Sequence, residues 1–339
     1  MKENNNTDQG LVCKHNKGPV ADIHPIKTGN YTIPTDEMFS LYEYMCTAID
    51  IGFDGSIIYG NAYTGKSYAI RQLTTWFEEK RNQKHATYRI SLSNKVYSYK
   101  EFFQYISEQI GCASDGRRLD GERVAEHLIN ALIFYGHMHS DKIVLILDEA
   151  ETLQITHYKS LKYLFNRLSD ADIKLVTFLV GTEALLNSRE VFVRSGSIGE
   201  QITRRFMQGE HHFHGITDTN KLQYILNGYD KQTYNGQTYT QYFFPEAWER
   251  GCRLSDLSEV MTDTILKKTG LDKLPEFPMG YFTKMINALF ITFGRDTEKI
   301  DTYGRSSRKD WITYEEIEKM ISMLNLDSKL IELSAKGKQ

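Results

Sequence analysis

Apolar and polar positions follow two different periodicities along the chain. Between residues 56 and 216, short continuous apolar runs such as SIIYG, KIVLIL and KLVTFLV are separated by stretches whose apolar residues recur every three or four positions. Short apolar runs indicate buried strands, and the wider spacing indicates amphipathic helices. Strands that alternate with helices predict a mostly parallel sheet covered on both faces. The predicted fold class is therefore α/β.

The periodicity changes on both sides of this region. The first residues are polar and rich in Asn, Lys and Gly, whereas Met38, Leu41, Met45 and Ile49 already follow a helical spacing. After His214 the apolar spacing is almost entirely helical. We find no internal repeat. The predicted organisation is a flexible arm over 1–34, an α/β nucleotide-binding domain over 35–216, a helical lid domain over 217–325 and a polar tail over 326–339. The tail is expected to be a frayed helix end or a docking peptide.

Charge and cysteine content narrow the function classes. Lysine and arginine number 41 against 44 aspartate and glutamate, a net charge of −3, so any contact with nucleic acid must come from a local patch. The 4 cysteines lie far apart, without the spacing of a disulfide framework or a zinc site. Neither an apolar leader nor a run long enough to span a membrane is evident. We expect a soluble, cytoplasmic protein.

The clearest motif lies between the first strand and the next helix. Its sequence, GNAYTGKS, fits the pattern GxxxxGK[ST], in which a glycine-rich turn wraps its N–H groups around phosphate oxygens at a helix N-terminus. Lys66 is placed to bridge the outer phosphates, and Ser67 to offer a hydroxyl ligand to Mg²⁺. The alternative is a chance glycine-rich turn. The expected nucleotide-binding residues are Gly60, Asn61, Ala62, Tyr63, Thr64, Gly65, Lys66, Ser67 and Tyr68.

Two carboxylates end the strand IVLIL. Asp148 and Glu149 stand where parallel sheets bind ligands, outside the carboxyl ends of the strands. Asp148 is expected to hold Mg²⁺ through its water shell, and Glu149 to act as the general base that activates a water. The alternative is that both acids cap the following helix, where they favour its positive end.

Three further residues complete the expected catalytic set. Thr182 follows the strand KLVTFLV. At this position, P-loop ATPases with an additional strand carry a polar group that contacts the attacking water. Thr182 suits the N-cap of the following helix equally well. Arg204 or Arg205 is expected to reach the phosphate site of a neighbouring subunit and to neutralise charge in the transition state. The alternative for the arginines is a solvated helix face, and Arg189 and Arg194 remain substitutes.

Four segments, in this order and before a helical lid, resemble AAA+ ATPases of the initiator and helicase-loader type. They are GNAYTGKS, LILDEAETL, FLVGTEALL and ITRRF. Within them the chain is most similar to the transposition regulators TnsC, TniB and MuB. The resemblance covers residues 36–325. It implies an AAA+ P-loop fold, ATP with Mg²⁺, the roles given above for the two acids, Thr182 and the arginines, and assembly into rings or filaments on duplex DNA.

The resemblance also implies partners. These are transposase subunits and a target-selecting protein of the TniQ type, which in some systems is bound to a CRISPR effector. The chain departs from the family in two places. The lid segment lacks a clear arginine, leaving Lys284 as a weak candidate to contact nucleotide, and the Tyr-rich segment 229–244 has no assigned role.

Two other features have competing interpretations. Lys95 and Lys100 stand among hydroxyl and aromatic residues after the second strand and are candidates for sequence-independent DNA contacts; an ordinary solvated loop is as good an explanation. The histidines at 211, 212 and 214, and those at 137 and 139, offer metal ligands. Because no acidic or thiol partner is close in sequence, we expect no metal there.

Other classes of function remain open. A small-molecule P-loop kinase predicts a monomer whose turnover ignores DNA. A nucleotide-switched signalling or defence scaffold predicts oligomers that form without DNA, and a helicase loader or initiator would share the AAA+ fold. The choice of ATP over GTP rests on the resemblance.

Overall fold

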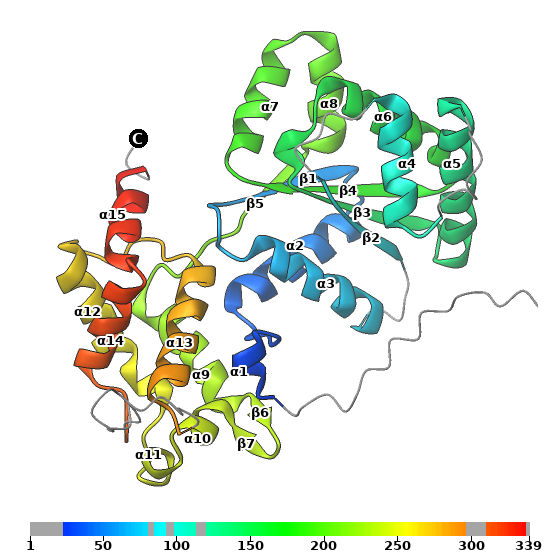
Figure 1. The fold of residues 1–339 in the computed structure, drawn as a ribbon. Coiled ribbons are helices and arrows are strands. Elements are labelled where there is room, and N and C mark those ends of the chain that lie inside the picture. Colours follow the sequence, from blue (N-terminus) through cyan, green and yellow to red (C-terminus); the bar gives the residue numbers. More distant parts are fainter. Residues whose placement is uncertain (1–22, 81–84, 93–97, 113–119, 296–309, 337–339) are drawn as a thin grey trace, which may run out of the picture.

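The computed structural model describes residues 23–80, 85–92, 98–112, 120–295 and 310–336. The chain folds into two halves, a sheet covered by helices and a bundle of helices (Figure 1). The sheet has five strands in the order β2-β3-β4-β1-β5, and every neighbouring pair is parallel. The strands are β1 (Gly55–Tyr59), β2 (Ala86–Ser91), β3 (Lys142–Asp148), β4 (Lys174–Gly181) and β5 (Gly209–His212). The prediction of a mostly parallel α/β sheet is confirmed.

Alternate residues of the strands face opposite layers. In β3, Ile143, Leu145 and Leu147 pack on one side, and Val144 and Ile146 pack on the other. Because successive strand side chains point to opposite faces, a strand buried on both faces is a continuous apolar run.

The two layers are made of different helices. One is α2 (Asp36–Asp50) and α3 (Lys66–Lys80). The other comprises α4 (Tyr99–Gln109), α5 (Gly121–Met138), the short 3₁₀ turn η1 (Ala150–Thr152), α6 (Ile155–Ser169), α7 (Ala184–Arg194) and α8 (Ser197–Phe206). The helix expected from Thr35 is α2, and Thr35 caps it by accepting a hydrogen bond from the backbone N–H of Met38 at 3.2 Å.

The second half has its own apolar core. Its main helices are α9 (Thr219–Lys231), α10 (Tyr239–Phe243), α11 (Pro245–Glu249), α12 (Ser258–Thr269), α13 (Met279–Phe293), α14 (Tyr314–Met323) and α15 (Leu326–Lys336). The 3₁₀ turn η2 (Leu254–Leu257) precedes α12, and a small hairpin is formed by β6 (Thr233–Tyr234) and β7 (Gln237–Thr238). An isolated antiparallel bridge between Ile216 and Phe277 joins the chain entering this half to the segment before α13.

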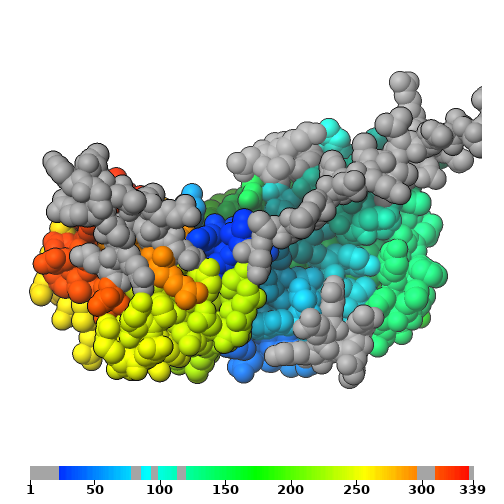
Figure 2. All heavy atoms as spheres, turned by 60° about the horizontal axis from the view of Figure 1, so that its bottom comes forward, coloured from blue at the N-terminus to red at the C-terminus, as the bar shows by residue number. Residues whose placement is uncertain are grey.

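Part of the expected N-terminal arm is packed rather than free. Residues 25–28 form the short helix α1 (Pro25–Thr28), and Ile26 and Ile33 are buried in the core of the helical half. Figure 2 shows this dark-blue segment between the two halves. The arm expected over 1–34 is therefore corrected for its described part, residues 23–34.

The Tyr-rich segment explains this packing. The buried ring of His24 lies within 4.4 to 4.8 Å of the ring centroids of Tyr234, Tyr239, Tyr242 and Phe243. Aromatic side chains bury large surfaces and prefer such edge and tilted contacts. Segment 229–244, which had no assigned role, thus anchors the N-terminal segment.

The expected polar tail is corrected in the same way. Residues 326–336 form α15, whose Leu326 and Leu330 are buried against the helical core. A helix with apolar residues four positions apart buries one face, so the tail is a packed helix and not a frayed helix end. In the described part of the chain, no helix combines the length and apolarity needed to cross a membrane.

Candidate active site

The strand register brings the predicted motifs to one edge of the sheet. β4 lies between β1 and β3, with Tyr59 opposite Gly181 and Val180 opposite Asp148. All strands run in the same direction, so their carboxyl ends meet at this edge. The turn after β1, Asp148 at the end of β3 and Thr182 after β4 are therefore neighbours.

The glycine-rich turn has the backbone that its sequence predicted. It connects β1 directly to α3, and both Tyr63 and Gly65 have positive φ angles, of 63° and 106°. Gly60 allows a close approach of backbone, because a Cβ there would collide with the carbonyl oxygen of Phe213. The turn therefore ends at the N-terminus of α3, where N–H groups without helical partners favour an anion.

Lys66 is folded into the centre of this turn. Its Nζ donates to the carbonyl oxygens of Gly60 at 2.8 Å and Asn61 at 2.6 Å. Burial lowers the pKa of Lys66, and the nearby carboxylates of Glu151 and Asp148 oppose that shift. The ammonium is thus placed among carbonyl oxygens that phosphate oxygens could replace as acceptors.

Ser67 and Asp148, both expected to serve Mg²⁺, are in contact. The Ser67 hydroxyl donates to Asp148 Oδ1 at 3.1 Å, and the Asp148 side chain is only 4% exposed. The other oxygen, Oδ2, accepts a charge-assisted hydrogen bond from Arg89 of β2 at 2.9 Å. A buried carboxylate needs such a partner. Sequence reasoning missed Arg89, whose position inside a predicted strand gave no local sign of this contact.

Glu149 follows Asp148 at the carboxyl edge of the sheet. Its backbone has a left-handed φ of 61°, and its side chain is exposed. A non-glycine residue in this region of φ is uncommon and turns the side chain away from the strand direction. The carboxylate is therefore accessible to solvent at the edge where the phosphate-binding turn lies.

Glu151 is a second acid that the sequence analysis missed. Its Oε1 accepts a weak hydrogen bond from the backbone N–H of Thr182 at 3.4 Å, and a Cβ on Gly181 would collide with the same carboxylate. Its charge is the largest electrostatic influence on Lys66. The signal available was the third acid in the run DEAE, two positions after Glu149. Thr182 itself lies at the tip of β4 as predicted.

A cavity of about 310 Å³ adjoins the turn. It lies between the phosphate-binding turn, the N-terminal segment and α13. Lys284 of α13, the weak candidate for a nucleotide contact from the lid, lines this cavity. Tyr68 also lines it; its hydroxyl lies 2.6 Å from that of Thr32 and also donates to the carbonyl of Tyr31. Burial raises the pKa of Tyr31, another lining residue, to about 12. The lining residues are Gly29, Tyr31, Ile33, Thr35, Met38, Thr64, Gly65, Tyr68, Phe213, Met279, Gly280, Thr283 and Lys284.

The helical half contacts the turn directly. The Gly280 N–H donates to the Tyr63 carbonyl at 3.0 Å, and the Tyr63 and Tyr281 rings stack with centroids 5.2 Å apart. Lys284 Nζ lies 5.9 Å from both ring centroids. These contacts link α13 to the residues expected to hold phosphate.

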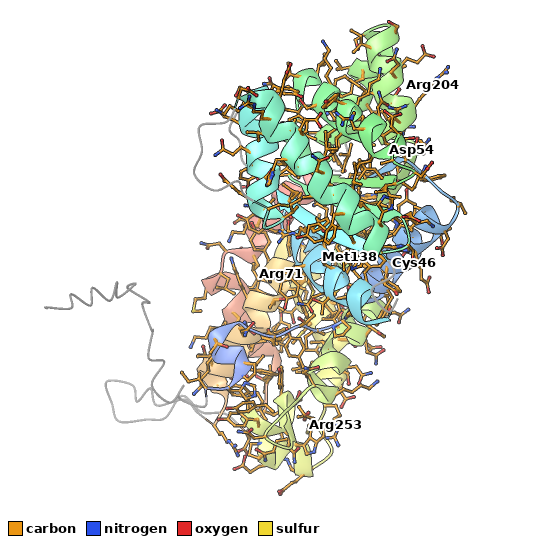
Figure 3. The ribbon with its side chains drawn as sticks, turned by 90° about the vertical axis from the view of Figure 1, so that its right-hand side faces the viewer. Cys46, Asp54, Arg71, Met138, Arg204 and Arg253 are labelled. Atoms are coloured by element: carbon orange, nitrogen blue, oxygen red, sulfur yellow. The ribbon has the colours of Figure 1, made fainter. Side chains whose placement is uncertain are left out.

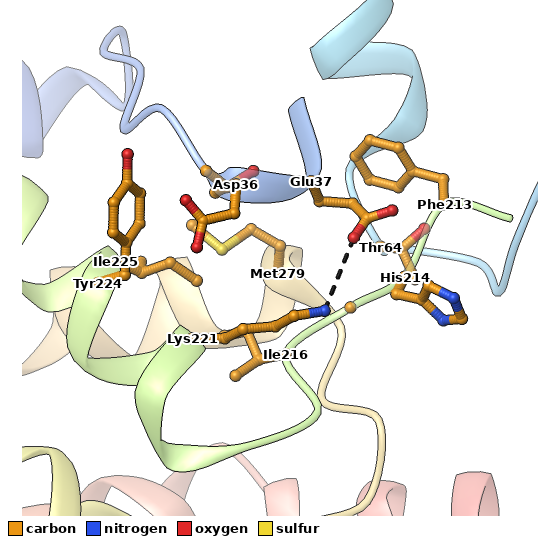
Figure 4. Close-up of a pocket in the computed structure, with 12 residues that line it drawn as sticks. Asp36, Glu37, Thr64, Phe213, His214, Ile216, Lys221, Tyr224, Ile225 and Met279 are labelled. Carbon is orange, nitrogen blue, oxygen red and sulfur yellow. Dashed lines mark ion pairs between the residues drawn. The ribbon is translucent and has the colours of Figure 1, made fainter. Parts of the chain in front are cut away.

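A smaller pocket next to the first contains an ion pair. Lys221 Nζ, on α9, lies 3.7 Å from Glu37 Oε2, on α2 (Figure 4). This ion pair connects the two halves. Burial raises the pKa of Glu37, but the His211 ring nitrogen 3.7 Å away, the His214 backbone and the Lys221 charge outweigh it and lower the pKa overall. Glu37 is therefore held ionised between the halves.

Arg204 and Arg205 lie at the opposite edge of the sheet. They line a surface hollow with Asp54, the residue before β1, and Figure 3 shows Arg204 and Asp54 near each other and away from Arg71 of α3. Five strand residues at about 3.3 Å each separate the two edges by roughly 16 Å. Both arginines therefore lie at the end of β1 opposite to the phosphate-binding turn of their own chain.

The two arginines differ in freedom. Arg204 is 78% exposed, and among the described residues its ion-pair partner is Glu200 of its own helix at 2.5 Å. Arg205 donates to Asn166 at 2.8 Å and stacks on the Phe165 ring at 4.2 Å. Arg204 is therefore the more accessible to a neighbouring molecule.

The remaining expected residues are placed as follows. Lys100 is exposed in the first turn of α4, which follows the carboxyl end of β2. Lys95 lies outside the described residues. Arg189 pairs with Glu210 at 2.7 Å and Arg194 with Glu190 at 3.8 Å, so both substitutes are engaged in surface ion pairs.

Comparison with known proteins agrees with this geometry. A family model described as "AAA domain" matches residues 55–188, from β1 into α7. The fold is that of a P-loop AAA+ ATPase. The match spans the phosphate-binding turn, the acidic strand and Thr182 of this AAA+ fold and ends before the arginines of α8.

Solved structures resemble the chain at low sequence identity. The Drosophila ORC bound to DNA has 11% identity and a TM-score of 0.50, over 96% of this chain and 71% of that chain. The ORC2 protein of Aeropyrum pernix, in ADPNP–ADP complexes, has 14% identity and a TM-score of 0.47, over 92% of this chain and 96% of that chain. No curated protein matches the sequence. At such identities the likeness concerns the fold alone.

Proposed function

We propose that this chain binds ATP with Mg²⁺ and hydrolyses it. The observation that carries the proposal is the Ser67–Asp148 hydrogen bond at the end of a buried strand, beside Lys66 in a glycine-rich turn. Hydroxyl and carboxylate oxygens are the donors that Mg²⁺ prefers, so the residues fit the ion. The cavity between Tyr31, Met38 and α13 has the position and size to take the base and sugar of the nucleotide.

The chain's own groups divide the chemistry among them. Lys66 exchanges its carbonyl acceptors for phosphate oxygens and neutralises their charge. Glu149, exposed at the carboxyl edge, orients a water and accepts its proton. Thr182, at the strand tip between the turn and Asp148, holds that water by its hydroxyl, and Glu151 fixes the backbone of Thr182.

The arginines extend the proposal to an assembly. Because Arg204 and Arg205 lie at the amino edge of the sheet, and β1 separates this edge from the phosphate-binding turn by roughly 16 Å, their expected role requires a second copy of the chain. An arginine supplied by a neighbour neutralises the charge that develops in the transition state. Hydrolysis then depends on contact between protomers, in a ring or filament.

The partner proposed for the assembly is duplex DNA. Lys95 and Lys100 follow the second strand, and lysines suit phosphate contacts that ignore base sequence. The resemblance of GTEALL and ITRRF to the transposition regulators TnsC, TniB and MuB supports a finer role, in which the assembly links a TniQ-type target-selection protein to transposase recruitment and activation. We place the protein in the cytoplasm, where such partners act.

A second candidate is a helicase loader or replication initiator. It is supported by the likeness to the Drosophila ORC, which extends over both halves of this chain. Both candidates predict assembly with nucleotide on DNA. They differ in whether the assembly stimulates a transposase or binds a replicative helicase.

Electron microscopy with and without duplex DNA, with ATP or a non-hydrolysable analogue, tests the proposal. We expect rings or filaments that require nucleotide and are favoured by duplex. Monomers under all conditions would favour a small-molecule kinase, and oligomers indifferent to DNA would favour a signalling scaffold. Strand-transfer assays with transposase and a TniQ-type protein then separate the transposition role from the initiator role.

A further inference from the structure

Three side chains from distant segments form a cluster beside the phosphate-binding turn. His212 ends β5, His214 follows it, and Glu276 comes from the segment before α13. One ligand atom from each lies within 4.8 Å of the others. The two histidine rings lie 3.8 Å apart between centroids. Among the described residues, this is the one group of three or more His, Cys, Asp or Glu side chains whose ligand atoms lie close enough to hold a metal ion.

We propose that His212, His214 and Glu276 form a binding site for a transition-metal ion such as Zn²⁺, which ties the helical half to the edge of the sheet. Two imidazoles and one carboxylate are a donor set that suits Zn²⁺ and its neighbours in the first transition row. Mg²⁺, which prefers oxygen ligands, is a poor match. Sequence reasoning expected no metal because the acidic partner is supplied only by the fold.

The ring of His212 is held ready to bind. It stacks on Tyr59 with centroids 4.7 Å apart and an interplanar angle of 13°. Its Nε2 is buried and has no hydrogen-bond partner among the described residues. A buried polar atom without a partner is costly, and a metal ion would satisfy it.

Glu276 is positioned by the protein and keeps capacity for a metal. Its Oε2 accepts from the Asn61 side chain at 2.5 Å, and its Oε1 accepts from the Gly215 N–H at 2.7 Å. A carboxylate has about four lone-pair sites, so two hydrogen bonds leave room for coordination. Such hydrogen bonds to a ligating group orient it.

His214 presents its ring to this cluster and not to the neighbouring ion pair. In the close-up of the Glu37–Lys221 pocket its imidazole points away from the ion pair (Figure 4). The proposed site therefore adjoins that pocket and shares His214 with its lining. It is separate from the Ser67–Asp148 pair, although Asn61 links it to the phosphate-binding turn.

The consequence of metal binding would be mechanical. Glu276 stands three residues before Met279, where α13 begins, and Gly280 of α13 donates to Tyr63 in the turn. An ion bound between β5 and Glu276 would restrain the angle between α13 and the sheet. Binding to the folded chain alone also raises its melting temperature.

Zn²⁺ titration of the metal-free full-length protein by calorimetry tests the proposal. We expect one ion per chain, and at least tenfold weaker binding in His214→Ala and in Glu276→Gln, which keeps the shape of the side chain. Mg²⁺ should not compete. His127→Ala, an exposed histidine on α5, is the matched control and should bind as the parent does.

Two results would overturn the site. One is Zn²⁺ binding that is unchanged in both variants, or that disappears only when the thiols are alkylated. The other is the absence of a one-to-one event in the folded parent protein. Circular dichroism of each variant confirms that it is folded, and a melting temperature that rises with Zn²⁺ in the parent and in His127→Ala, but not in Glu276→Gln, gives a readout independent of ATP hydrolysis.

Discussion

The two edges of the central sheet differ in a way that the parallel strands dictate. At the carboxyl edge, three features converge because β1, β3 and β4 end side by side. They are the phosphate-binding turn, Asp148 and Thr182. At the amino edge, Asp54 and the arginines of α8 form a separate hollow. One chain presents both groups but cannot bring them together. If the arginines act as the proposed function requires, a complete site combines the amino edge of one copy with the carboxyl edge of another.

Removing the central cation of the carboxyl edge should have the largest effect. In Lys66→Ala the phosphate charge loses its ammonium, so we expect nucleotide binding to weaken by about a hundredfold or more, with assembly and hydrolysis lost together. Fluorescent-nucleotide titration and electron microscopy measure both. Lys273→Ala, an exposed lysine of the helical half, is the control. Unchanged assembly in Lys66→Ala would remove the site from its proposed role.

Removing the cation of the amino edge should spare binding and affect turnover. In Arg204→Ala we expect nucleotide affinity close to that of the parent and hydrolysis lower by about a thousandfold. Mixing Arg204→Ala with Lys66→Ala should restore part of the activity, because the first supplies an intact phosphate site and the second an intact arginine. Steady-state ATPase assays across mixing ratios measure this.

The arginine experiment has a close structural control. Arg194 is 81% exposed and pairs with Glu190 four residues earlier, as Arg204 at 78% pairs with Glu200. Arg194→Ala should therefore leave hydrolysis unchanged. If Arg205→Ala alone is rescued by mixing, the finger is Arg205. Rescue of neither, or loss in Arg194→Ala, would contradict the assignment to these two residues.

Changing the expected base should separate binding from hydrolysis within the carboxyl edge. In Glu149→Gln we expect ATP to bind normally and hydrolysis to fall by about a hundredfold, since general-base catalysis contributes that much or more. The assembled form should then persist, which light scattering over time detects. Glu151→Gln is the informative comparison. If the assembled form persists in Glu151→Gln and not in Glu149→Gln, the general base is Glu151 and the assignment to Glu149 is wrong.

Local sequence patterns predicted the sheet and the contiguous parts of the site. Each central strand is an unbroken apolar run because helices cover both faces, and β3 shows this most clearly. The phosphate-binding turn follows from glycine positions that a strand-to-helix turn requires. Asp148 followed from its place at the end of such a run. These signals are local, so one sequence suffices to read them.

Contacts between distant segments were not predictable in this way. Tyr31 and Tyr229 are 198 positions apart, yet their hydroxyls lie 3.1 Å from each other. Arg89 and Glu276 likewise acquire their partners only when strands and halves pack. A side chain's tertiary partner leaves no periodic trace in its own segment. The packing of the N-terminal segment, and that of the helix at the chain's end, were missed for this reason.

The smallest expected effect concerns DNA at the periphery of the carboxyl edge. Lys100 is exposed at the start of α4, and if it contacts a DNA phosphate, Lys100→Ala should weaken binding a few-fold for all sequences. It should also reduce the slope of log affinity against log salt by about one, because one fewer counterion is released. Fluorescence anisotropy at several salt concentrations measures both, with Lys273→Ala as the control. An unchanged slope would mean that the DNA-facing surface lies elsewhere, and nucleotide binding in the same variant should stay normal, since Lys100 is not among the residues that line the cavity.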